Sequence, residues 1–217
     1  MKYHYKNGII DRQKSSKLLL VIPFIGIIGG SYLLLNTIAP SLPSSLSTEV
    51  AAVTKTLKQR QPSLDKNRLY VPKIGVDVEI VVGVNDKTLE GGAWHRVPQN
   101  GDPVKGGNFV LAAHRFNLGL TPDQTRAKSP FYHIEKLESG DQIFVDYQGT
   151  RYVYGVTKRY KVAATEVSIE SASTDPKLTM YSCDLRGPDA GREVIEAHPI
   201  GTVAWTETGP KIKASTP

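Results

Sequence analysis

The sequence has little cysteine, since Cys183 is the only one among 217 residues. One cysteine cannot form an internal disulfide, and it cannot supply the paired thiols of a zinc ribbon or a CxxC redox site. The chain also contains no Walker loop, GxGxxG, HExxH or EF-hand pattern and no internal repeat. None of the nucleotide or metal sites that these motifs mark is therefore expected.

Charge is unevenly distributed along the chain. Residues 1–17 hold five Lys or Arg against Asp11, a net charge of +4 out of the formal +6 of the whole chain. The +2 that remains is too little for a strongly basic nucleic-acid-binding face. We expect no nucleic-acid partner.

Charged residues are absent altogether from Leu18 to Thr48. Residues 18–38 read LLLVIPFIGIIGGSYLLLNTI, and as a helix they would span about 31 Å, the thickness of a bilayer's hydrocarbon core. A cleaved secretory signal has a shorter apolar core, and here Pro40 directly follows Ala39, the best small residue for cleavage. The segment therefore predicts an uncleaved transmembrane signal anchor.

The basic flank of this anchor lies on its N-terminal side, which predicts the orientation in the membrane. Residues 1–17 should stay in the cytoplasm and all that follows should lie outside the cell. Residues 39–66 should form an extracellular linker, Pro/Ser-rich up to residue 48, with a possible short helix from Glu49 to Gln61.

From about residue 67 the pattern changes to short apolar runs rich in β-branched and aromatic residues. Gln148-Gly149 predicts a hairpin over residues 142–156, and Phe131–Leu137 predicts one short helix. Seven or eight short strands with few helices indicate one mainly β domain, a barrel or sandwich over residues 67–205. The polar tail, residues 206–217, is expected to be disordered. The strand candidates are Leu69–Val71, Val76–Val82, Phe109–Leu111, Ile143–Val145, Tyr152–Tyr154, Leu178–Tyr181 and Val194–Ile195.

Cys183 is the first candidate for chemistry, because a free thiol is unusual in an exported domain. It ends the predicted strand from Leu178, and Arg192 opens the next strand after a Gly/Pro loop. Antiparallel pairing would bring Arg192 beside the thiol, where a guanidinium favours the thiolate and holds a developing oxyanion. Arg186 is a rival for this role, but its place in the loop predicts a solvated side chain. A buried, inert cysteine is the alternative interpretation.

A thiol nucleophile needs a proton carrier, and histidine suits that role near neutral pH. His114 ends the predicted strand that begins at Asn108, so it lies where a strand meets a loop. His4 falls in the cytoplasmic segment and is excluded. The other three are expected to be structural or surface histidines: His95, His133 and His198.

In order and motif these residues resemble the sortases, membrane-anchored cysteine transpeptidases of Gram-positive-type bacteria. A strand ends in His-Arg, a strand LTMYSC follows about 70 residues later, and an arginine opens the last main strand. Further similar segments lie at residues 68–76 (RLYVPKIGV), 92–95 (GAWH), 107–115 (GNFVLAAHR) and 131–141 (FYHIEKLESGD).

The resemblance implies an eight-stranded sortase-type β-barrel with His114, Cys183 and Arg192 as the catalytic residues. Ala113 stands where the family usually has Gly, and Met180 and Ser182 replace the usual Leu and Thr. By the same resemblance Ala113, Arg115 and Ser182 are expected to bind substrate.

The implied reaction is cleavage of an LPxTG-like sorting motif between Thr and Gly through a thioester on Cys183. The acyl group would pass to an amine, from a lipid-linked peptidoglycan precursor or a pilin lysine. The resemblance implies no cofactor. Calcium is left open, because Asp77, Glu79 and Glu170 are oxygen donors without a distinctive spacing. No lid motif precedes the barrel, so the chain looks more like the small classes D, E or F.

Two other classes of function compete with this hypothesis. An L,D-transpeptidase places arginine two residues after its cysteine, where this chain has Leu185. A non-catalytic, membrane-tethered β-domain would keep Cys183 buried. Another extracytoplasmic thiol protease is a milder variant of the same chemistry.

Overall fold

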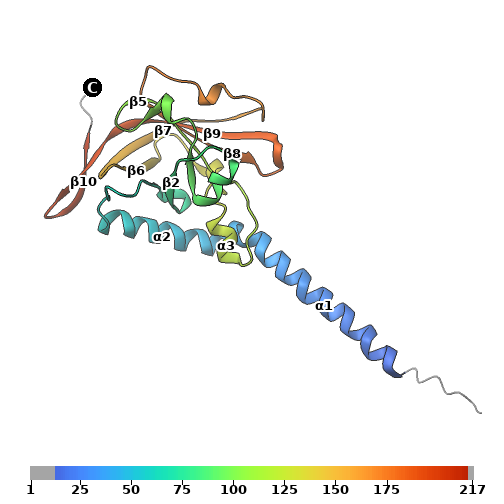
Figure 1. Cartoon of the computed structure of the whole chain (residues 1–217). Coiled ribbons are helices and arrows are strands. Elements are labelled where there is room, and N and C mark those ends of the chain that lie inside the picture. The colour runs from blue at the N-terminus through green and yellow to red at the C-terminus, as the bar shows by residue number, and fades with distance from the viewer. Residues whose placement is uncertain (1–12, 215–217) are drawn as a thin grey trace, which may run out of the picture.

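The computed structural model of the chain describes residues 13–214, the side chains of 13–20, 44 and 45 aside (Figure 1). Helix α1 (Gln13–Ile38) projects from a β domain, and helix α2 (Pro43–Gln59) runs along one side of that domain. Residues 1–12 of the predicted cytoplasmic segment and 215–217 of the predicted tail lie outside the described residues.

Eight strands close into a barrel. Around the ring their order is β1, β2, β3, β5, β8, β9, β7, β6 and back to β1, with parallel pairing only at β2/β3 and β5/β8. The mainly β, eight-stranded barrel that the resemblance implies is thus confirmed. The ring strands are β1 (Arg68–Val71), β2 (Val76–Val81), β3 (Ala93–His95), β5 (Gly106–Ala112), β6 (Gln142–Tyr147), β7 (Thr150–Val162), β8 (Lys177–Asp184) and β9 (Gly187–Thr206).

The remaining strands, helix and 3₁₀ turns are not part of this ring. β4 (Gly101–Asp102) pairs with β5, and β10 (Gly209–Ala214) pairs with the end of β9. Helix α3 (Pro122–Ala127) follows β5. The 3₁₀ turns are η1 (Ala39–Ser41), η2 (Pro72–Ile74), η3 (Asp86–Gly91), η4 (Pro98–Asn100), η5 (Ile134–Lys136) and η6 (Ser168–Glu170).

The core fills the inside of the ring with every second residue of each strand. On β8 the buried core residues are Leu178 and Met180, and on β9 they are Ile195 and Ala197. Because successive side chains of a strand point to opposite faces, Tyr181 and Cys183 of β8 lie on the outer face of the barrel.

The predicted hairpin over residues 142–156 is confirmed by the pairing of β6 with β7. Gln148 and Gly149 join the two strands with φ angles of 48° and 78°. Two successive positive φ values fit a type I′ turn, whose twist matches that of the flanking strands.

The predicted linker differs from what the structure contains. η1 and then α2 follow α1 at once, and α2 begins at Pro43, six residues before the expected helix start at Glu49. Proline suits the first turn of a helix, because its missing N–H has no intrahelical acceptor there. α2 packs closely on the barrel: Gly75 has φ of +69°, and a Cβ added to it would lie 2.5 Å from the Cβ of Glu49.

Arg151 fixes the far end of α2 to the barrel. Its guanidinium donates to the backbone oxygens of Leu57 and Arg60, at 2.8 and 2.9 Å. It also binds the carboxylate of Asp146 through Nε and Nη2, at 2.6 and 2.7 Å. Both side chains are almost completely buried.

Two further expectations differ from the structure. The tail predicted to be disordered contains β10, which pairs with β9 from Gly209↔Thr206 to Ala214↔Gly201. Residues 131–137, predicted as a short helix, form turns and the single 3₁₀ turn η5.

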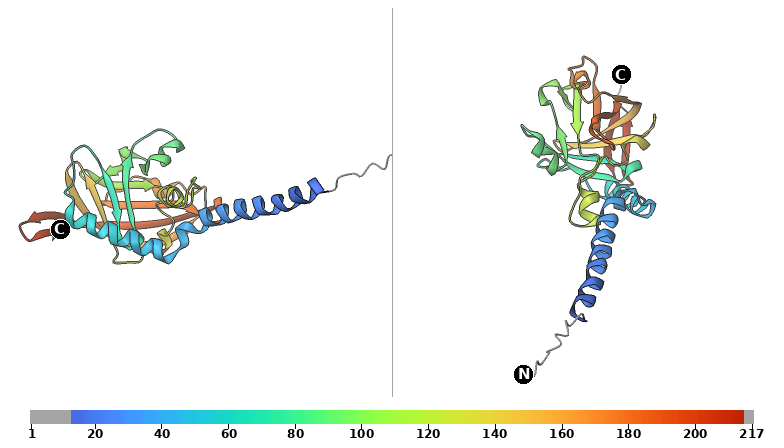
Figure 2. Two further views of the ribbon diagram at one scale, coloured as in Figure 1. Left: turned by 90° about the horizontal axis from the view of Figure 1, so that it is seen from below. Right: turned by 90° about the vertical axis from the view of Figure 1, so that its right-hand side faces the viewer.

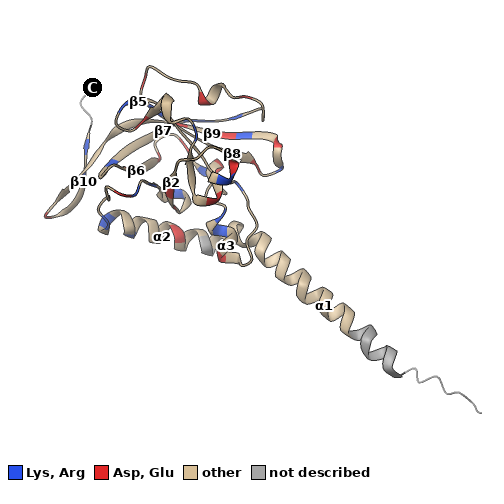
Figure 3. Ribbon diagram, viewed as in Figure 1, with Lys and Arg blue, Asp and Glu red and all other residues tan. Residues whose placement is uncertain are grey.

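Helix α1 is a candidate membrane span. The segment Val21–Ser41, which runs from α1 through η1, is long and apolar enough to cross a bilayer, and only 6% of its most apolar stretch is buried. Figure 2 shows α1 extending away from the domain, and Figure 3 shows no Lys, Arg, Asp or Glu along its coloured length. The predicted transmembrane anchor, residues 18–38, falls within α1.

Candidate active site

Strands β8 and β9 place Arg192 directly across from Cys183. Their antiparallel register runs from Leu178↔Ala197 to Cys183↔Arg192 and is interrupted only beyond the cysteine. Side chains directly opposite each other on one face have Cβ atoms about 4.5–5.5 Å apart. The prediction that antiparallel pairing brings Arg192 beside Cys183 is confirmed.

His114 reaches the same region from β5, which pairs in parallel with β8. The last pair of this ladder is Ala112↔Tyr181, and the backbone N–H of Ala113 donates to the carbonyl of Tyr181 at 3.3 Å. His114 and Cys183 each lie two residues beyond that last pair. The three residues predicted as catalytic therefore gather at one end of the outer face formed by β5, β8 and β9.

Cys183 is a free cysteine of intermediate exposure. Part of the residue therefore reaches solvent at the outer face, where a substrate has access. This is not the enclosed position that the interpretation as an inert core cysteine requires.

Glu90 of η3 holds His114. Its carboxylate accepts from Nε2 of His114 at 3.1 Å, from Nδ2 of Asn117 at 2.8 Å and from Nζ of Lys128 at 3.3 Å. Burial alone would raise the pKa of Glu90, but Lys128 and His114 outweigh it and hold the pKa below its ordinary value. Glu90 lies 24 residues before His114 in a turn, so no local pattern in the sequence signals this contact.

Arg192 is steadied by the loop that precedes it. Its Nη1 donates to the carbonyl of Gly191 at 3.0 Å and also to the carbonyl of Pro188. Arg186 instead points to solvent with its side chain 74% exposed, and its Nε pairs with Asp184 at 3.0 Å. That hydrogen bond and the charge of Arg186 lower the pKa of Asp184.

The segment between β7 and β8 borders this outer face. The side-chain amide of Asn108 donates to the carbonyl of Ile169 at 3.0 Å, which fastens η6 over β5. The hydroxyl of Tyr181 donates to Glu170, which also binds Nε of Arg96 at 3.0 Å. Burial and the hydrogen bond to Glu170 raise the pKa of Tyr181, so its hydroxyl stays protonated at neutral pH.

The acidic residues considered for calcium are not gathered in one place. Asp77 accepts from Nε of Arg68 at 2.9 Å, and Glu170 is engaged by Arg96 and Tyr181. Among residues 13–214, no group of three or more His, Cys, Asp and Glu is arranged to hold a metal ion.

The three residues predicted to bind substrate are all buried. Ala113 is 4%, Arg115 6% and Ser182 2% exposed. The guanidinium of Arg115 pairs with Glu135, and the hydroxyl of Ser182 donates to the carbonyl of Cys183 at 3.3 Å. Ala113 and Ser182 directly precede the candidate catalytic residues His114 and Cys183 in the chain.

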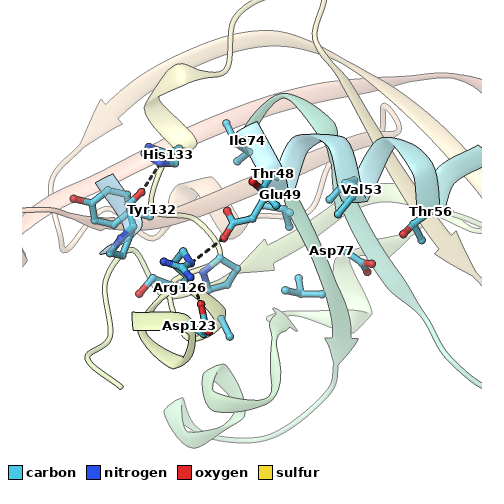
Figure 4. A pocket seen from close by; sticks show the side chains of 18 residues that line it. Thr48, Glu49, Val53, Thr56, Ile74, Asp77, Asp123, Arg126, Tyr132 and His133 are labelled. Atoms are coloured by element: carbon cyan, nitrogen blue, oxygen red, sulfur yellow. Dashed lines mark hydrogen bonds and ion pairs between the residues drawn. The ribbon is translucent and has the colours of Figure 1, made fainter. Parts of the chain in front are cut away.

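A cavity of about 520 Å³ lies between α2, β2 and α3 (Figure 4). Glu49 and Arg126 face each other in it, with 3.4 Å between Oε1 and Nε. None of the six predicted site residues lines this cavity.

The family model described as "Sortase domain" matches residues 69–200, which is more than half of the chain. The chain belongs to the sortase family. Sortase A of Listeria monocytogenes is 30% identical over 143 residues, which cover 64% of this chain and 59% of that relative. Sortase SrtE1 of Streptomyces coelicolor is 36% identical over 92 residues, covering 40% and 24%. The matches thus span less than two thirds of these relatives' length.

Solved sortase structures share the fold. The structure of Listeria monocytogenes sortase A superposes with a TM-score of 0.54 at 24% identity, covering 65% of this chain and 91% of that one. A sortase D5 transpeptidase of Clostridium perfringens gives 0.51 at 19% identity, covering 77% and 99%.

Proposed function

We propose that this sortase-family chain is a membrane-tethered cysteine transpeptidase of classes D, E or F, with Cys183 as nucleophile. The observation that carries the proposal is the strand register. It sets Cys183 across from Arg192 and brings His114 to the same end of the same outer face. A thiol, a guanidinium and an imidazole so placed are the groups that acyl transfer through a thioester needs.

In the first half-reaction the Cys183 thiolate attacks the carbonyl carbon of the scissile peptide bond. Arg192 donates to the oxygen that becomes negatively charged, and His114 as imidazolium protonates the departing amine. The C–N bond breaks and a thioester on Cys183 remains. The Glu90 carboxylate, 3.1 Å from Nε2 of His114, forms an ion pair with the protonated ring.

In the second half-reaction an amine attacks the thioester carbonyl. His114 takes the proton of the incoming amine, and the thiolate of Cys183 leaves. Water in place of the amine gives hydrolysis, so the same site would act as a thiol protease when no acceptor is present. These steps require only protein side chains and the two substrates.

The proposed acyl donor is a surface protein with an LPxTG-like motif, cleaved between Thr and Gly. The proposed acceptor is an amine of a lipid-linked peptidoglycan precursor or a pilin lysine. α1 would span the cell membrane with the N-terminus in the cytoplasm and the barrel outside. Both substrates would then be met at the outer surface of the membrane.

The test uses the full chain in detergent, because α2 packs on the barrel and should not be cut. Wild type and the variants Cys183→Ala, His114→Ala and Arg192→Ala are incubated with a panel of LPxTG-like peptides and an amine. We expect no amide product with Cys183→Ala and strongly reduced product with His114→Ala and Arg192→Ala. Absence of product across the panel, with a Cys183 that resists thiol reagents in the folded protein, would favour the non-catalytic β-domain.

A further inference from the structure

The loop between β5 and α3 exposes an unusual set of apolar side chains. Residues 116–122 read FNLGLTP and carry no charge. Phe116, Leu118 and Leu120 are 40%, 45% and 74% exposed. Large apolar side chains gathered on one exposed loop indicate a surface that another apolar phase covers.

This loop lies against the candidate membrane helix. The hydroxyl of Tyr32 in α1 donates to the carbonyl of Leu120, 88 residues away in the chain. Asn36, one turn further along α1, is only 1% exposed. Figures 1 and 2 both show the end of α1 beside α3.

The hydrogen bond from Tyr32 sets the position of the loop along the axis of α1, and therefore its depth in the membrane. It lies six residues before Ile38, the end of α1, which is about 9 Å along the helix axis at 1.5 Å per residue. Around it, Leu33, Leu34 and Leu35 are more than half exposed, as lipid-facing residues are. The carbonyl of Leu120 is thus held at a level within the apolar part of α1.

The backbone N–H groups of the loop have hydrogen-bond acceptors within the protein, as a position inside the bilayer requires. Polar backbone groups that leave water must find partners within the protein. Three N–H groups of the loop have side-chain acceptors, each at 2.9 Å: Asn117 with Ser129 Oγ, Gly119 with Thr125 Oγ1, and Leu120 with Gln124 Oε1. The polar groups point inward while the apolar side chains point out.

We propose that the loop Phe116–Thr121 inserts into the outer interface of the lipid bilayer, as a second membrane contact beside α1. Tyr32 lies before the end of the apolar segment of α1, so it would hold the loop in the outer leaflet, just below the lipid headgroups. The loop starts two residues after His114. Contact with lipid would therefore fix the distance between the membrane and the outer face formed by β5, β8 and β9. That consequence for catalysis rests on the proposed function, whereas the insertion itself does not.

The test places an environment-sensitive fluorophore on the loop of the full chain in phosphatidylcholine–phosphatidylglycerol vesicles. Leu118→Cys and Leu120→Cys are each made in a Cys183→Ser background and labelled with a nitrobenzoxadiazole dye. The control is Val167→Cys, a 73% exposed site beside η6, which Figure 1 shows on the side of the barrel away from α1. All three are compared in vesicles with and without lipids that carry a nitroxide high on the acyl chain.

We expect a blue-shifted emission and about twofold stronger nitroxide quenching at both loop sites than at the control, as for side chains inserted at an interface. Emission and quenching equal to the control at both sites would overturn the proposal. A blue shift that disappears as protein is diluted in lipid would also overturn it, since a second copy of the chain would then cover the loop. The readout needs no turnover, so it is independent of the transpeptidase proposal.

Discussion

Cys183 and Arg192 lie opposite each other across two antiparallel strands, and this pairing distinguishes the two arginines nearest the thiol. Arg192 lies on the outer face with its guanidinium steadied by the carbonyls of Pro188 and Gly191. Arg186 lies in the loop between β8 and β9, and its guanidinium pairs with Asp184. Only Arg192 is paired across the strands with Cys183, and under the proposed function it is the one that would bind the developing oxyanion.

Arg192→Ala should therefore lower kcat/KM for transpeptidation by about a hundredfold to a thousandfold, the usual loss when an oxyanion donor is removed. The control Arg186→Ala should stay within about twofold of wild type, because a solvated ion pair contributes little. The measurement is the rate of amide product formation at low substrate concentration. Equal losses in the two variants would mean that the guanidinium acts only through the general charge of the site.

Glu90 should act as a positioning residue for His114. Glu90→Gln removes the ion pair that favours the protonated ring, so kcat/KM should fall about two- to fivefold, as expected for a partly exposed pair. The loss should appear in kcat with KM nearly unchanged, because Glu90 acts through His114. Lys128→Gln is the control, because it removes another partner of Glu90 and leaves the contact with His114. An unchanged kcat in Glu90→Gln would assign the contact a purely structural role.

At this scale the sequence predicted Cys183, Arg192 and His114 because each ends or begins a recognisable strand. The contact of Glu90 with His114 was not predicted. Closure of the barrel brings η3 to His114, and no local pattern in the chain shows this. Arg115, predicted to bind substrate, is buried, and its guanidinium pairs with Glu135. Burial of a charged residue depends on a partner 20 residues away, which no local pattern reveals.

Helix α2 is fixed to the barrel through the buried pair of Arg151 and Asp146. Arg151→Met would leave the Asp146 carboxylate buried without its cation and free the backbone oxygens of Leu57 and Arg60. We expect a loss of about 3–5 kcal/mol in the free energy of unfolding, as when one partner of a buried pair is removed. Urea denaturation of the full chain, followed by tryptophan fluorescence, gives the value.

The matched control for this prediction is the exposed Lys73, which pairs with Glu138 and Asp141 at the surface. Lys73→Met should leave the urea midpoint almost unchanged. A similarly small effect of Arg151→Met would show that α2 is held by apolar packing rather than by the arginine.

Elements that depend on a local sequence pattern were predicted correctly, whereas elements that depend on contacts far apart in the chain were not. Gln148-Gly149 fixed a hairpin because the turn needs two positive φ values. The start of α2 was placed too late because Ser44, Ser45 and Ser47 resemble a linker, although Pro43 is a good first helical residue. β10 was missed because Lys211 and Lys213 make it polar, and its pairing with β9 alone makes it a strand.

The molecule as a whole carries buried histidines that link its stability to pH. His95 is 2% exposed and its Nε2 lies 3.0 Å from the carbonyl of Gly101. Burial lowers the pKa of His95 below its ordinary value despite this hydrogen bond, and burial also lowers the pKa of His133. Both rings are therefore neutral in the folded protein at neutral pH.

A histidine whose folded pKa is lowered binds more protons in the unfolded chain. Its contribution to stability is complete above about pH 6.5 and is lost as the pH falls from there toward the folded pKa. The free energy of unfolding of wild type should thus fall more steeply between pH 7 and 5 than that of His95→Gln, whose amide can still donate to Gly101. Parallel curves for the two proteins would contradict the assignment of His95 as a buried neutral ring.

The proposed reaction depends on a thioester between the substrate and Cys183, and intact-mass spectrometry of the full chain detects this intermediate. The enzyme is mixed with an LPxTG-like peptide without an amine acceptor, quenched in acid and weighed. We expect a mass gain equal to the acyl part of the N-terminal peptide fragment, mapped to Cys183 and released as an amide once an amine is added. Cleavage of the peptide by Cys183→Ala at the wild-type rate, or an adduct on any other residue, would contradict it.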